Sequence, residues 1–294
     1  TAALIVFGAL TTCLDDSRRV TGALALGAAC LCRYDAWPAA AVFAALAVND
    51  AIKSSPRRGA LLGAAALAVA PACAWVLHGA AAHGSPLFFV HRVTAYHRAV
   101  DGHEGTLAAL AAYPLTLVRA EPELTFASAF VISWALSVDR AAFRVLLRPA
   151  LVLGGLLGFL MLGRIMGGAP THHDARTLLP IWTGLALVTA ALVVRWTGGP
   201  RRLPRAAAAG ALAVVLASTL VRVLRPAGSF APRTAERAIG DNARRVLGGT
   251  DRLLVDTADY GYFAVIAAFG APERARPFER RDPREPPEPD AFAS

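Results

Sequence analysis

The stretch "GALLGAAALAVAPACAWVL", residues 59–77, carries no charged side chain. About 20 predominantly apolar residues in a helix are enough to cross the hydrocarbon core of a bilayer. Three other apolar runs approach this length, at 145–163, 176–194 and 206–224. A series of such runs predicts an all-α polytopic membrane protein, whereas a signal peptide would be one short run near the start.

The composition supports the same class. Of the 294 residues, 55% are hydrophobic and 17% are charged, and the mean hydropathy is +0.47. Soluble domains are about a quarter charged, so charge is depleted here as it is in lipid-embedded chains. We expect about seven to nine membrane segments within 1–226. The chain begins at Thr1 inside an apolar run, and we therefore interpret it as a fragment that lacks at least one earlier segment.

The net charge of +9 is unevenly distributed along the chain. Residues 1–226 carry 20 basic and 10 acidic side chains, whereas the remainder carries 10 and 11. Basic loops between apolar segments mark the cytoplasmic side of membrane proteins, so the excess indicates topology and argues against a nucleic-acid partner. With the loops 53–58 and 195–205 inside, the segments 32–38, 84–105 and 164–175 fall outside.

Some segments allow more than one interpretation. Residues 20–32 and 38–48 form either two short helices with an outer turn or one long interrupted helix. Residues 105–119 are short and contain Pro114, which predicts an interrupted interfacial or re-entrant piece. The four cysteines lie in apolar runs without the spacing of a zinc or redox motif, and we interpret them as small packing residues. They are Cys13, Cys30, Cys32 and Cys73.

The C-terminal part differs in composition. Residues 227–270 predict a small extracytoplasmic α/β element, with a helix at 234–249 and then a buried strand, a turn and a helix at 251–270. Asp256 and Asp259 follow the strand, where aspartates bind ligands in α/β folds or cap helices and form turns. Residues 271–294 are rich in proline and charge, which predicts a disordered tail.

Polar side chains gather at 84–105, "GSPLFFVHRVTAYHRAVDGHEG". At helical spacing they predict an amphipathic helix on the membrane surface. Two interpretations remain open: its cations hold lipid headgroups, or its polar face lines a site for an anionic, lipid-attached substrate. The apolar stripe is Phe89, Val93, Tyr96 and Val100, and the polar face is His91, Thr94, Arg98 and Asp101.

Two further polar clusters lie on the same predicted outer side. In "CRYDAWP", 32–38, charged residues interrupt apolar sequence, and such residues at membrane depth usually pair or serve a site. In "GGAPTHHDARTLLP", 167–180, Asp174 or Thr171 caps a helix, or Arg176 binds a phosphate. The adjacent histidines resemble no defined metal motif, so no metal ligand is assigned and the cofactor stays unknown.

Three stretches carry a family resemblance. "LCRYDAWPAAAVFAAL" resembles the Arg-Tyr-acidic/Gly-Trp stretch of polytopic GT-C glycosyltransferases, the protein-mannosyltransferase and aminoarabinose-transferase-like group. "GSPLFFVHRVTAYHRA" is similar to the Gly-x-Pro segment that follows a transmembrane helix in bacterial members. "DARTLLPIWTGLAL" resembles their Arg-x-Leu-Leu-Pro helix start. The resemblance runs over most of 1–226 through short motifs.

The resemblance implies an enzyme of the bacterial plasma membrane whose site faces outside. It would move a sugar from a polyprenyl-phosphate carrier to an acceptor that the sequence does not identify. An acidic loop upstream of Thr1 would supply the base, so this piece alone is expected to be inactive, and Asp15 and Asp16 are not assigned that role. Cationic groups would stabilise the departing phosphate. The candidate substrate-binding residues are Arg33, Tyr34, Asp35, His91, Arg92, Arg98, His172, His173 and Arg176.

Two other functions compete with sugar transfer. A transporter or flippase for lipid-linked or anionic solutes accounts for the helices and the outer cations equally well. The sequence shows no clear internal repeat or matching pair of broken helices, the usual sign of a transporter, which disfavours this alternative. A non-catalytic membrane subunit of an envelope assembly fits a chain without the acidic loop.

Overall fold

The computed structural model describes ten stretches of the chain, and it divides the chain into two units, Thr1–Val221 and Arg222–Ser294. The sequence placed this boundary at 226/227. The described residues are 1–14, 16–53, 55–91, 93–94, 105–138, 140–167, 174–197, 202–224, 233–256 and 261–278.

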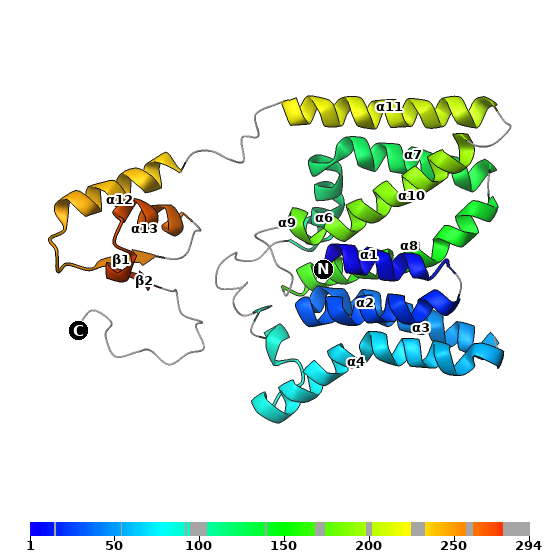
Figure 1. Cartoon of the computed structure of the whole chain (residues 1–294), viewed down its shortest axis with the longest axis horizontal. Helices are drawn as coiled ribbons and strands as arrows, with labels where there is room; N and C mark the ends of the chain where they lie inside the picture. Colours follow the sequence, from blue (N-terminus) through cyan, green and yellow to red (C-terminus); the bar gives the residue numbers. More distant parts are fainter. Residues whose placement is uncertain are drawn as a thin grey trace. The chain divides into compact units, whose positions relative to one another are not determined.

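The first unit is built from helices that run back and forth, so that short turns collect at two opposite ends (Figure 1). Three of these turns are 3-10 helices: η1 (Asp16–Arg18), η2 (Tyr34–Ala36) and η3 (Ser55–Arg57). The α-helices are α1 (Ala2–Thr11), α2 (Arg19–Cys32), α3 (Trp37–Lys53), α4 (Arg58–His83), α6 (Thr106–Ala120), α7 (Pro122–Val138), α8 (Arg140–Ile165), α9 (Asp174–Thr177), α10 (Leu179–Thr197) and α11 (Arg202–Leu224).

Among the described residues, three helical stretches are long and apolar enough to cross a membrane, which is consistent with the predicted α-helical membrane class. They are Arg58–His83, Phe143–Ile165 and Leu179–Trp196. The count of seven to nine segments is not confirmed, because other apolar helices among the described residues are shorter. These are Ala2–Thr11, Arg19–Cys32, Thr106–Ala120 and Leu212–Val221.

The structure decides between the interpretations of residues 20–48. Two helices form, because α2 ends at Cys32 and Arg33 takes an extended backbone conformation, with φ −155° and ψ 135°. The single interrupted helix is therefore wrong. The expected interruption at Pro114 is wrong as well, since α6 continues through this residue. With 15 residues, α6 is about 22 Å long at 1.5 Å per residue, shorter than a hydrocarbon core.

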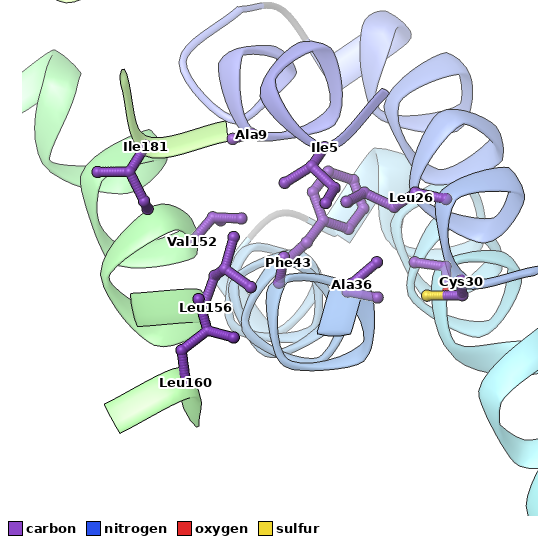
Figure 2. Packing of buried hydrophobic residues seen from close by; sticks show 14 of the residues in the cluster. Ile5, Ala9, Leu26, Cys30, Ala36, Phe43, Val152, Leu156, Leu160 and Ile181 are labelled. Atoms are coloured by element: carbon purple, nitrogen blue, oxygen red, sulfur yellow. The ribbon is translucent and has the colours of Figure 1, made fainter. Parts of the chain in front are cut away.

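The core of the first unit joins helices that are far apart in sequence. Ile5, Leu26, Phe43 and Leu156 meet there from α1, α2, α3 and α8 (Figure 2). Small residues allow close approach, as at Gly27, where a Cβ atom would lie 3.1 Å from the Leu67 carbonyl oxygen. Among the cysteines, Cys30 belongs to this core, Cys13 is partly buried, and Cys32 and Cys73 are exposed.

A buried ion-pair cluster, the Asp50 clamp, ties four segments together at one end of the unit. Arg19 Nη2 donates to Asp50 Oδ2 at 3.0 Å and to the Thr12 carbonyl at 2.9 Å. Arg148 Nη1 and Nη2 donate to the two Asp50 oxygens, both at 2.7 Å. The side chains of Arg19 and Asp50 are 2% and 11% exposed. The clamp thereby fixes the end of α1, the start of α2, the end of α3 and the first half of α8.

We predict that Asp50→Asn destabilises the first unit by about 3–5 kcal/mol, because it leaves the buried Arg19 guanidinium without its carboxylate. Thermal unfolding in a neutral detergent measures the effect. Lys53→Gln is the control, because it also changes the charge of α3 by one unit but at an exposed position. It should change the unfolding temperature little. Equal stability of the two variants would contradict the clamp's role.

The second unit contains a small α/β element. It consists of α12 (Thr234–Val246), β1 (Leu253–Asp256), α13 (Tyr262–Phe269), η5 (Pro272–Arg274) and β2 (Ala275–Phe278). β1 and β2 pair in parallel, with Leu253 opposite Ala275 and Asp256 opposite Phe278. A parallel pair needs a crossover connection, which α13 supplies. The predicted order of helix, strand and helix is therefore present.

The disorder predicted from residue 271 is wrong for 271–278. These residues form η5 and β2, and Arg274 Nε donates to the Asp251 carbonyl at 2.9 Å. The high proline content of the stretch predicted disorder, although part of it forms a strand that pairs with β1. Residues 279–294 and Asp259 lie outside the described residues, and Asp256 is the last residue of β1.

We predict that Gly240→Ala loosens the packing of α12 on α13. A Cβ atom at Gly240 would lie 2.3 Å from the Val265 carbonyl oxygen and 3.0 Å from the Phe269 nitrogen, and overpacking of this kind costs about 1–3 kcal/mol. Amide hydrogen exchange in 234–246 and 262–269 should accelerate. Gly249→Ala, where a Cβ meets nothing within 4 Å, is the control, and equal exchange in both variants would refute the prediction.

Candidate functional site

A pocket of about 250 Å³ lies at the end of the first unit where η2, α9 and the start of α1 meet. Segments distant in the sequence contribute to it: Arg33 and Asp35 come from the turn between α2 and α3, and Arg176 comes from α9. Ile5, Leu156 and Leu179 form an apolar part of the wall. Two of the three polar clusters identified in the sequence thus line one pocket.

Arg33 and Asp35 form a close ion pair within this pocket. Arg33 Nε donates to Asp35 Oδ1 at 3.1 Å and to Oδ2 at 2.9 Å, and Nη2 lies 2.8 Å from Oδ2. The Asp35 side chain is 9% exposed and that of Arg33 is 36% exposed. The hydrogen bonds to Asp35 raise the pKa of Arg33. The ion-pair interpretation of this cluster is therefore confirmed, whereas a role in a functional site stays a prediction.

Arg176 supplies a positive charge to the pocket that no described residue neutralises. Its side chain is exposed, and it forms no ion pair with any residue that the structure describes. Because the charges of Arg33 and Asp35 cancel, the described lining side chains sum to one positive charge. Such a pocket favours an anion, and the planar guanidinium suits the two oxygens of a phosphate or carboxylate.

The position of Arg176 depends on contacts made by α9. Arg164 Nη1, near the end of α8, donates to Asp174 Oδ2 at 2.5 Å, and the Arg164 guanidinium lies 5.7 Å from the Tyr113 ring centroid. Thr177 Oγ1 donates to the Asp174 carbonyl at 2.9 Å. The Asp174 carboxylate, one of the two predicted helix caps, is thus engaged by Arg164. Thr171, the other predicted cap, lies outside the described residues.

The third polar cluster contacts the same turn through aromatic rings. Phe89 lies 5.8 Å from the Tyr34 ring centroid and 5.1 Å from the Trp37 ring centroid. The chain reaches this position by a turn at Gly84, whose φ of 65° is costly for residues other than glycine. The segments 32–38 and 84–91 are therefore neighbours, although His91 and Thr94, the described residues of the polar face, are not among the residues that line the pocket.

The remaining predicted site residues are distributed as follows. Tyr34 lies against Phe89 and is not among the residues that line the pocket, and His91 is exposed outside it. Residues 88–91 and 93–94 are helical, as expected for the start of the amphipathic helix. Its continuation at 95–100 lies outside the described residues, as do Arg92, Arg98, His172 and His173.

The sequence did not predict the apolar residues of the pocket wall. Ile5, Leu156 and Leu179 have the pattern of ordinary apolar helix residues, and nothing in the sequence relates their three helices to one another. Among the described residues, no group of three histidine, cysteine or acidic side chains is arranged to hold a metal ion. Asp35, the one carboxylate among the described residues that line the pocket, has both oxygens bound by Arg33.

Comparison with known proteins adds no further assignment. No protein-family model, no curated protein sequence and no solved structure matches the chain. The function is therefore argued from the pocket and from the motifs.

We predict that Tyr34 contributes to stability below its raised pKa. Burial, and secondarily the charge of Asp35, raise the pKa of Tyr34 above its usual value of 10.0. A phenol whose pKa is raised by folding stabilises the folded state below the unfolded pKa, and this contribution is lost as the pH rises through the folded pKa. When the pH is raised from about 8 to about 11, the unfolding temperature of Tyr34→Phe should therefore fall less than that of the unmodified chain. An equal fall in both chains, measured by thermal melts, would contradict this prediction.

Proposed function

We propose that the pocket binds the phosphate of a lipid-linked sugar and that the full protein is a membrane glycosyltransferase. In this proposal a sugar passes from a polyprenyl-phosphate donor to an extracytoplasmic acceptor. The observation that supports the proposal most is Arg176, a guanidinium without an ion-pair partner among the described residues, in a pocket shared with the Arg33–Asp35 pair. The motif resemblance selects sugar transfer from the reactions that such a pocket fits.

The composition of the wall supports a lipid-attached ligand. Arg176 lines the pocket together with Ile5, Leu156 and Leu179. Leu156 and Leu179 belong to stretches that are long and apolar enough to cross a membrane. A phosphate bound at Arg176 would therefore leave its hydrocarbon chain beside apolar helices, where burial of each CH₂ contributes about 0.8 kcal/mol.

The pocket supports phosphate binding rather than proton abstraction. Asp35 is held by three contacts from Arg33, and a carboxylate engaged in this way is a poor general base. We therefore assign the base to an acidic loop outside the described residues, as the family resemblance implies. Arg176 would stabilise the charge that develops on the departing lipid phosphate.

We further propose that the pocket faces the extracytoplasmic side of a bacterial plasma membrane and that seven to nine segments cross it. The support for this orientation is the distribution of exposed cations. Arg18, Lys53 and Arg58 are exposed and belong to η1, the end of α3 and the start of α4, elements whose turns lie at the opposite end of the unit (Figure 1). Cytoplasmic loops are enriched in such residues.

Whether Arg176 binds the phosphate of the donor can be tested by a binding measurement with a control variant that loses the same charge elsewhere. We expect Arg176→Gln to weaken binding of a short isoprenyl phosphate about 10- to 100-fold, because a hydrogen bond to a charged group contributes about 1.5–3 kcal/mol. The chain is titrated in nanodiscs of neutral lipid, with binding read by native mass spectrometry. Arg119→Gln removes an exposed cation of α6 that does not line the pocket and should bind normally. Unchanged binding in Arg176→Gln would refute the proposal.

A flippase or transporter for the same ligand is the second candidate. The observation in its favour is that Asp35, the carboxylate of the pocket, is neutralised by Arg33, which is compatible with binding without chemistry. A sugar-transfer assay on the full protein, run beside a lipid-flipping assay in the same vesicles, separates the two. Transfer that depends on Arg176 supports the enzyme, whereas Arg176-dependent flipping without transfer supports the transporter.

A further inference from the structure

A cluster of exposed cations, the basic rim, lies at the end of the first unit opposite the pocket. Its members are Arg18, Lys53, Arg58, Arg140 and Arg144. They belong to η1, the end of α3, the start of α4 and the start of α8, whose turns share one end (Figure 1). None of the five forms an ion pair with another residue that the structure describes.

The Asp50 clamp holds these cations near one another. Arg18 directly precedes Arg19, Lys53 follows Asp50 on α3, and Arg144 lies one helical turn before Arg148 on α8. Because Arg19, Asp50 and Arg148 are in direct contact, the three supporting elements cannot separate. The clamp also occupies both oxygens of Asp50, so this carboxylate does not neutralise the rim.

The sequence around these turns carries an excess of positive charge. The segments 15–19, 50–58, 139–148 and 195–205 carry 12 basic and 4 acidic side chains. Ion pairs with Asp50 engage Arg19 and Arg148 of these segments. The exposed cations of the basic rim remain available to bind an anion.

The basic rim lies where two membrane-length helices begin. The apolar stretch Arg58–His83 starts at a rim residue, and Phe143–Ile165 starts beside Arg144. The ends of such helices lie at the level of the lipid headgroups. Basic residues there are attracted to anionic lipids by about 1 kcal/mol each, which corresponds to about fivefold in affinity.

We propose that the basic rim binds the headgroup of an anionic phospholipid from the surrounding leaflet. The lipid phosphate accepts hydrogen bonds from Lys53 and Arg144, and the acyl chains lie along the apolar surfaces of α4 and α8. Leu62 and Leu67 of α4 and Val145 and Leu147 of α8 are exposed and available for this contact. The site is separate from the pocket and does not depend on the proposed sugar transfer.

Native mass spectrometry of the purified chain with phosphatidylglycerol or phosphatidylcholine tests the proposal. We expect the unmodified chain to retain phosphatidylglycerol preferentially. The double variant Lys53→Gln/Arg144→Gln should bind it more than tenfold more weakly, since each lost cation costs about fivefold. Arg119→Gln removes an exposed cation from α6, outside the rim, and should retain the preference. An absent preference in the unmodified chain, or one that the double variant retains, would overturn the proposal.

Two further measurements complete the test. Inorganic phosphate, added at the same concentration as phosphatidylglycerol, should leave the unfolding temperature of the protein unchanged, because it has no acyl chain to bury. If it stabilises the chain as phosphatidylglycerol does, and the double variant abolishes both effects, the rim takes a soluble phosphate and the lipid proposal fails. If circular dichroism shows the double variant unfolded, Lys53→Gln alone is compared, and unchanged lipid affinity in this folded variant would overturn the proposal.

Discussion

The ion pairs of Asp50 with Arg19 and Arg148 are the constraint on which the rest of the first unit depends. Taking Arg19 and Asp50 out of water is costly. Their hydrogen bonds to each other, and those of Asp50 to the partly exposed Arg148, must offset that cost. The contacts of 2.7–3.0 Å do so only when the α1–α2 turn, α3 and α8 keep a fixed arrangement. The clamp is therefore a geometric requirement on four segments at once.

The consequences of this arrangement extend to the other end of α8. Arg148 and Arg164 lie on the same helix, about 24 Å apart along its axis at 1.5 Å per residue. Once the clamp fixes α8 at Arg148, the position of Arg164 is fixed as well, and Arg164 holds Asp174 at the start of α9. Arg176 then follows within the same short helix. In this way a packing constraint at one end determines where the cation of the pocket lies at the other.

The sequence predicted the features that depend on local pattern. The α-helical membrane class followed from the apolar runs, and a turn near Arg33 was one of the two interpretations of residues 20–48. It did not predict the pairing of Asp50 with Arg148, because these residues are 98 apart in the sequence and their contact follows from tertiary packing. For the same reason the apolar wall at Ile5 and Leu156 was missed. Proline also led to two wrong predictions. An interruption was expected at Pro114, but α6 continues through it. Disorder was expected around Pro277, but this residue belongs to β2 of a two-stranded sheet, where edge positions tolerate proline.

The central claim is that the clamp and the pocket lie at opposite membrane faces, with the pocket outside. Labelling with a membrane-impermeant maleimide tests it most directly, using Lys53→Cys and Leu179→Cys separately in a chain whose four cysteines are replaced by serine. In right-side-out vesicles the account predicts labelling of Leu179→Cys and protection of Lys53→Cys, with the reverse in inverted vesicles. Labelling of both positions from the same side would contradict it.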